Sequence, residues 1–294
     1  GFGMFLLNFS KPENFQPFIL ISVIFSCALI PILLTKRKAP TFKKITTMNM
    51  RDLYNASPLG AVCALLFGAT QSAFFMLLAV YGASMNFSIF EISFVTFLVG
   101  ISGVISQYPV GYLSDKLDRR IVIIYSSFGA SIFAIMAIFS VKTMFLPEGL
   151  ASSKSWFFIF LVLFSFCSLP IFSQILAHTN DFITKDKFVA AGAAVQFTFG
   201  LGAMTGPILC SFIMDLMGPN GFFIFHIFFH LIIGFFGIHR MKARPVKENP
   251  DSQFVPVPQT ITPIGLELNP TTEPIEEPYT EKVQEMLKRK GVSY

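Results

Sequence analysis

Long apolar stretches separated by short polar connections dominate this sequence. A helix of about 20 apolar residues is long enough to cross a hydrocarbon core of roughly 30 Å. The pattern therefore predicts an all-α membrane protein with seven full transmembrane helices, near 15–35, 58–84, 90–113, 120–141, 156–178, 188–214 and 220–240. Residues 1–8 are expected to be the last turns of a further, partial helix, and no signal peptide is predicted before the first full span.

Basic residues occur mainly in alternate connections. The basic connections contain Lys36, Arg37, Lys38, Lys43, Lys44 and Arg51, then Lys116, Arg119 and Arg120, then Lys185 and Lys187, and finally Arg240, Lys242, Arg244 and Lys247. The other connections contain only Lys11, Lys142 and Lys154. Because short loops rich in Lys and Arg stay in the cytoplasm, the first residue is predicted to lie outside and the carboxy-terminal tail inside.

Composition supports the membrane assignment and narrows the function. Hydrophobic residues make up 53% of the chain and charged residues 13%. The net charge of +5 follows from the topology bias, so no nucleic-acid partner is inferred. The four cysteines lie singly in different apolar spans, which predicts buried thiols. Without a Ser-His-Asp, phosphate-loop or clustered-cysteine signature, neither an enzyme nor a cofactor is predicted.

A charged loop joins the predicted spans at 90–113 and 120–141. Residues 111–120 have the sequence Gly-Tyr-Leu-Ser-Asp-Lys-Leu-Asp-Arg-Arg. This loop resembles the signature loop of the major facilitator superfamily (MFS) of secondary transporters, G-x-L-x-D-[RK]-x-G-[RK]-[RK]. Asp118 stands in place of the inner glycine. Further short matches, Ser57-Pro58-Leu59-Gly60, Ala177 to Asp181 and Phe254-Val-Pro-Val-Pro, resemble the YcaD-like branch of bacterial MFS proteins.

The resemblance implies a fold of two six-helix halves, each built from inverted three-helix repeats. Residues 1–35 would then be the end of helix 5 and helix 6 of the amino-terminal half, and 36–57 the central cytoplasmic loop. Residues 58–240 would be the carboxy-terminal six-helix half, helices 7–12. Most of the amino-terminal half would lie outside this sequence. The Pro-rich residues 241–294 are expected to form a cytosolic, largely disordered tail.

The signature loop is expected to act as a conformational gate. Gly111 would let a helix end approach its neighbour, Asp115 would accept hydrogen bonds from a facing helix, and Lys116, Arg119 and Arg120 would anchor the junction. The alternative is that these charges only fix the topology.

A glycine motif lies within the predicted span at 188–214. Gly202 and Gly206 are four residues apart and Pro207 follows them. Such spacing permits close helix packing, and proline removes one backbone hydrogen bond. The motif also resembles the glycine-rich Gly-Pro motif of the family's fifth helix, so ordinary packing and a family-specific role both stay open.

Polar residues inside spans are candidates for substrate contacts, because an unpaired polar group is costly in hydrocarbon. The predicted substrate-binding residues are Gln71, Phe74, Phe75, Ser168, Gln174 and Gln196. The alternative for each is a side chain paired with a neighbouring helix. His226 and His230 have the spacing of a metal pair, but no metal site is predicted because that span is peripheral in the family fold.

These features predict a secondary active transporter of a small solute, working by alternating access in the bacterial cytoplasmic membrane. Proton coupling is considered, although no carboxylate lies mid-span and His178 is the local candidate. The competing hypothesis is a non-transporting sensor or scaffold with the same fold, acting through its cytosolic tail.

Overall fold

The computed structural model describes residues 15–33, 47–144, 153–184 and 187–243. Within these ranges it contains helices and no strands. The helices are α2 (Gln16–Leu33), α3 (Met50–Ala56), α4 (Pro58–Ser84), α5 (Ile89–Lys116), α6 (Arg119–Met144), α7 (Ser153–Ser168), α8 (Ile171–Asn180), α9 (Phe188–Met217) and α10 (Gly221–Ala243). The all-helical fold class predicted from the sequence is confirmed for the described residues.

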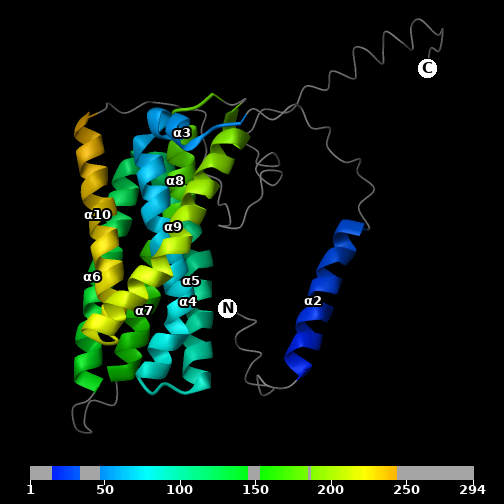
Figure 1. The fold of residues 1–294 in the computed structure, drawn as a ribbon, viewed down its shortest axis with the longest axis vertical. Coiled ribbons are helices and arrows are strands. Elements are labelled where there is room, and N and C mark those ends of the chain that lie inside the picture. Colours follow the sequence, from blue (N-terminus) through cyan, green and yellow to red (C-terminus); the bar gives the residue numbers. More distant parts are fainter. Residues whose placement is uncertain (1–14, 34–46, 145–152, 185–186, 244–294) are drawn as a thin grey trace, which may run out of the picture.

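Six spans of the described residues are long and apolar enough to cross a membrane: Pro58–Ser84, Ile89–Lys116, Arg119–Ser140, Lys154–Asn180, Phe188–Met217 and Gly221–Ala243. They agree with six of the seven predicted spans. The other, at 15–35, corresponds to α2, whose apolar part Phe18–Ile30 is shorter than a full span. Helix α2 lies apart from the bundle (Figure 1). The predicted partial helix at 1–8 and the tail from 244 lie outside the described residues.

The span Lys154–Asn180 consists of two helices, α7 and α8, separated by Leu169 and Pro170. Proline has no backbone N–H, so it cannot continue the hydrogen-bond ladder of α7. The other two mid-span prolines, Pro109 in α5 and Pro207 in α9, lie inside continuous helices.

Helices α4 and α9 pack closely through glycine. A Cβ atom at Gly202 would collide with the backbone of Leu65, and one at Gly206 with the backbone of Ala69. Gly68 of α4 approaches the backbone of Phe199 in the same way. Only glycine allows two helix backbones this close, as in glycine-spaced membrane helix pairs. Helix α4 also packs against α10.

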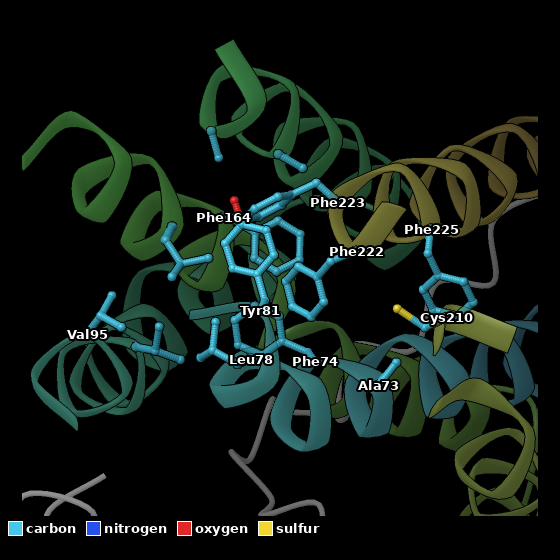
Figure 2. Packing of buried hydrophobic residues seen from close by; sticks show 14 of the residues in the cluster. Ala73, Phe74, Leu78, Tyr81, Val95, Phe164, Cys210, Phe222, Phe223 and Phe225 are labelled. Carbon is cyan, nitrogen blue, oxygen red and sulfur yellow. The ribbon is translucent and has the colours of Figure 1, made fainter. Parts of the chain in front are cut away.

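An aromatic cluster fills the bundle interior between α4, α7 and α10. Figure 2 shows Phe74, Tyr81, Phe164, Phe222 and Phe223 gathered there, all nearly inaccessible to solvent. Tyr81 stacks on Phe222 with ring centroids 5.2 Å apart. Since lipid is as apolar as these side chains, such interlocking contacts, and not water exclusion, hold the helices together.

A second apolar cluster lies toward the α3 end of the bundle and includes Leu53 of the short helix α3. Asn49 caps α3 by accepting a hydrogen bond from the Asp52 backbone N–H at 2.8 Å. The Asp52 carboxylate accepts one in return from the Asn49 N–H. With Leu53 buried, this capping box fixes α3 against α4 and α9.

Candidate functional site

The loop between α5 and α6 is held by buried ion pairs. Helix α5 ends at Lys116 and α6 begins at Arg119, so two residues make the turn. The Arg119 side chain is only 7% exposed, and its Nε lies 3.0 Å from Oδ2 of Asp181, the residue that caps the end of α8. Its Nη2 lies 3.5 Å from Oδ1 of Asp115. Arg119 therefore connects the end of α5 to the end of α8.

The next arginine pairs within the turn. Arg120 donates from Nε and Nη2 to both carboxylate oxygens of Asp118, at 2.7 to 3.1 Å, and its backbone N–H also donates to that carboxylate. Burial acts to raise the pKa of Asp118, but these hydrogen bonds and the Arg120 charge hold the pKa below its usual value. Asp118, which departs from the family pattern, thus has a structural partner.

The remaining gate residues differ in exposure. Gly111 is buried, whereas Lys116 is exposed and its Nζ lies 4.4 Å from the centre of the Tyr112 ring. A small pocket beside the turn is lined by Ser57, Pro58, Leu59, Arg120, His178, Phe182 and Arg240. Described residues in or next to each of the four basic connections therefore line one pocket at one end of the bundle. We call the residues Asp115, Asp118, Arg119, Arg120, Asp181 and Arg240 the charged end.

Three glutamines predicted to contact substrate lie within the spans. Gln71 of α4 is 3% exposed and Gln174 of α8 is fully buried. In the described part of the chain, Nε2 of Gln71 and both amide atoms of Gln174 have no hydrogen-bond partner. Gln196 of α9 is partly buried and its Oε1 also lacks one among those residues. Buried amide atoms normally find partners, so these three are exceptions that need a reason.

The other predicted substrate residues are not placed together. Phe74 packs in the aromatic cluster, with its ring centre 5.3 Å from that of Phe164, while Phe75 is 47% exposed on the bundle surface. Ser168 is buried and its Oγ lies 2.9 Å from Nε2 of His230. The glycine motif, Gly202, Gly206 and Pro207, lies on α9, where both glycines meet α4.

Sequence reasoning missed three groups of polar residues. His226 and His230 were treated as peripheral, yet both are buried against α4 and α7. Gln107 of α5 accepts a hydrogen bond from Ser173 of α8 at 3.3 Å, and its mid-span position was a usable signal. Asp181 stands out in the sequence only as part of a short family match, and its distance from Arg119 along the chain hides their pairing.

Metal binding finds no support in the described residues, which contain no cluster of three or more His, Cys, Asp or Glu that could hold an ion. Each imidazole nitrogen of His226 and His230 already has an oxygen within hydrogen-bond distance, at 2.7 to 3.1 Å.

Comparison with known families connects this geometry to a class of proteins. The family model described as Major Facilitator Superfamily matches residues 2–146 and 60–290. The chain belongs to the major facilitator superfamily. The MFS assignment predicted from the charged loop is therefore confirmed, and the chain is a multi-pass membrane protein.

Two curated MFS relatives support the predicted YcaD-like branch. The uncharacterized MFS-type transporter YcaD of Escherichia fergusonii is 19% identical over 224 residues, which are 76% of this chain and 55% of that protein. The uncharacterized MFS-type transporter YE1530 of Yersinia enterocolitica is 22% identical over 168 residues, 56% of this chain and 40% of that protein. The chain thus spans about half the length of these relatives. No solved structure matches.

Proposed function

We propose that this MFS chain forms the carboxy-terminal half of a secondary active transporter that moves a small polar solute by alternating access. The unpaired buried amides of Gln71 and Gln174 are the observation that carries this proposal. An amide in hydrocarbon without a partner costs free energy, and a solute that passes through the bundle would supply the missing hydrogen bonds. Residues 58–240 would then form the half-transporter, with 36–57 as its central loop.

The donor and acceptor set defines the solute class. Gln71 offers a free N–H donor, and Gln174 offers both a donor and an acceptor. The described middle of the bundle holds no carboxylate or ammonium that could neutralise a charged ligand. A neutral solute with hydroxyl or amide groups satisfies these side chains best, and exposed Phe75 could supply an apolar contact.

The charged end would serve as the gate. Arg119 holds the end of α5 to the end of α8 through Asp115 and Asp181, so a motion that separates these two helix ends must break at least one of the two pairs. A charge-assisted contact contributes about 1.5 to 3 kcal/mol, enough to shift a two-state equilibrium about tenfold or more. In this proposal, Arg119 sets the balance between the inward-open and outward-open states of the transporter.

Accessibility labelling tests the proposed pathway. In the full protein with its native cysteines replaced, Gln71→Cys and Gln174→Cys should react with a membrane-impermeant thiol reagent, despite lying inside apolar spans. Phe228→Cys is the matched control, because Phe228 is exposed on the outer face of the bundle at mid-span and should meet lipid. Protection of both glutamine positions in every condition would contradict the pathway.

Flux measurements test transport itself. Vesicles containing the protein should take up a neutral polar solute from a labelled panel faster than vesicles without it, and Gln71→Leu should weaken the apparent affinity up to about tenfold. Tyr125→Phe is the control, since Tyr125 lies on the exposed face of α6 and the variant removes a polar group outside the bundle interior. A protein that moves none of the panel but still binds a cytosolic partner would favour the sensor hypothesis.

The bacterial relatives support a place in the cytoplasmic membrane of a bacterium, with the basic connections inside. The rest of the transporter, equivalent to the amino-terminal half of the family fold, would complete the solute pathway.

A further inference from the structure

His226 of α10 lies between two backbone carbonyls. Its Nδ1 is 2.7 Å from the carbonyl oxygen of Phe222 and its Nε2 is 3.1 Å from that of Thr70 on α4. A carbonyl oxygen can only accept, and a neutral imidazole has only one N–H to donate. The neutral ring therefore leaves one nitrogen lone pair facing an oxygen lone pair, whereas an imidazolium donates to both.

The neighbouring His230 provides an internal contrast. Its Nδ1 is 2.8 Å from the carbonyl oxygen of His226, and its Nε2 is 2.9 Å from the Ser168 hydroxyl. The hydroxyl can donate to Nε2 while Nδ1–H donates to the carbonyl. A neutral His230 thus satisfies both contacts. Of the two histidines, His226 alone has surroundings that only the charged ring satisfies.

Aromatic rings surround the His226 imidazole. Their centroids lie 4.6 to 5.7 Å from its own, within the range over which a cation is attracted to an aromatic ring, and they belong to Phe74, Phe164, Phe222 and Phe225. The two carbonyl dipoles can thus stabilise a positive charge without a carboxylate, in a site lined by aromatic rings. Burial opposes that charge, so small changes in the surroundings can decide whether the proton is held.

The ionisable groups around His226 are few. Helix α10 contributes His230, α4 contributes Tyr81 through its stacking on Phe222, α7 contributes Cys167, and α9 contributes Cys210. Between its charged ends, α6 contributes serines and the outward-facing Tyr125. None of these groups carries a negative charge at neutral pH, so the two carbonyls remain the principal support for the proton.

We infer that His226 is a proton-binding site whose occupancy is linked to the position of α4. The Thr70 carbonyl belongs to α4, and the next residue, Gln71, is a candidate solute contact. A shift of α4 against α10 would lengthen the second hydrogen bond and release the proton. In this respect the inference rests on the proposed function, because it makes both solute binding and proton binding depend on the position of α4.

Histidine nitrogen NMR tests the site directly, since the chain has only four histidines. In the ¹⁵N-histidine-labelled full protein in lipid nanodiscs, the variants His226→Gln and His230→Gln assign the resonances of these two histidines. Between about pH 9 and about pH 5, His226 should pass from one protonated nitrogen to two, while His230 should keep a single neutral tautomer. A His226 ring that stays neutral throughout this range overturns the inference.

A second variant keeps the test informative if His226→Gln does not fold. Ser168→Ala removes only the hydroxyl beside His230, so it should shift the His230 resonances and leave the His226 transition in place. Movement of the His226 transition to the pH of an exposed histidine in this variant would count against the site. The NMR readout needs no transport, so a solute flux that fails contradicts the proposed function and leaves this result standing.

Discussion

The charged end and the middle of the bundle differ in whether their buried polar groups have partners within the protein. At the charged end, Arg119 and Arg120 are buried, and each has a carboxylate within 3.0 Å. In the middle, Gln71 and Gln174 are as deeply buried but have amide atoms without partners in the described residues. The two arginines thus have partners within the protein, whereas the two glutamines have amide atoms that lack a partner among those residues.

Under the proposed function, the paired arginines have a structural role and the unpaired glutamines have a ligand-binding role. A buried ion pair that keeps both partners costs little, but one that loses a partner leaves an uncompensated charge. An unpaired neutral amide already bears its cost in the folded state, so removing it need not destabilise the protein. The two regions should therefore respond oppositely to mutation, and the following variants test that contrast.

Removing the central cation should have the largest effect. Arg119→Leu leaves Asp181, with a side chain only 12% exposed, without its ion pair to Arg119. Loss of one partner of a buried pair costs about 3 to 5 kcal/mol. We expect a marked fall in thermal stability in detergent, with Lys116→Leu, at an exposed position of the same loop, as control. The double variant Arg119→Leu with Asp181→Leu should recover much of the loss, and failure to do so would argue against the pairing.

Disturbing the close contact between α4 and α9 should have the next largest effect. Gly206→Ala places a methyl group against the backbone of Ala69, which forces α9 away from α4. Overpacking of this kind typically costs about 1 to 3 kcal/mol. Gly200→Ala lies on the same helix, where an added Cβ meets nothing within 4 Å. Denaturation midpoints should fall for Gly206→Ala and stay level or rise for Gly200→Ala; equal shifts would show that close packing at Gly206 does not matter.

The outer partner of Arg119 should matter less than the inner one. The Asp115 side chain is 37% exposed and lies 3.5 Å from Arg119, so solvent screens the pair, and such pairs contribute up to about 1 kcal/mol. Asp115→Asn should therefore change stability slightly, while Asp181→Asn should change it more. Rates of solute flux in the two variants would show whether the gate depends on the same order of strength; a larger stability loss for Asp115→Asn would reverse our ranking of the pairs.

Hydropathy predicted the six spans correctly, because the bilayer requires about 20 apolar residues whatever their packing. The orientation of each helix could not be predicted in this way, since lipid-facing and core-facing surfaces are both apolar. Phe74 and Phe75 illustrate this: adjacent in sequence, one lies in the aromatic cluster and the other on the surface. The charged loop revealed the family, but its partner Asp181 is distant in sequence, and the interior position of His226 required the fold.

The sharpest test of the contrast has the smallest expected effect on stability. Gln174→Met keeps nearly the same volume and removes two amide atoms that have no partner among the described residues. Because no hydrogen bond is lost and an unpaired polar group disappears, the free energy of unfolding should stay within about 1 kcal/mol or rise. Solute affinity should nevertheless fall, which separates binding from folding when the melting temperature and flux are measured on the same preparation. A loss of stability comparable to that of Arg119→Leu would mean that Gln174 is already paired within the folded protein, and the middle of the bundle would then be as complete as its charged end.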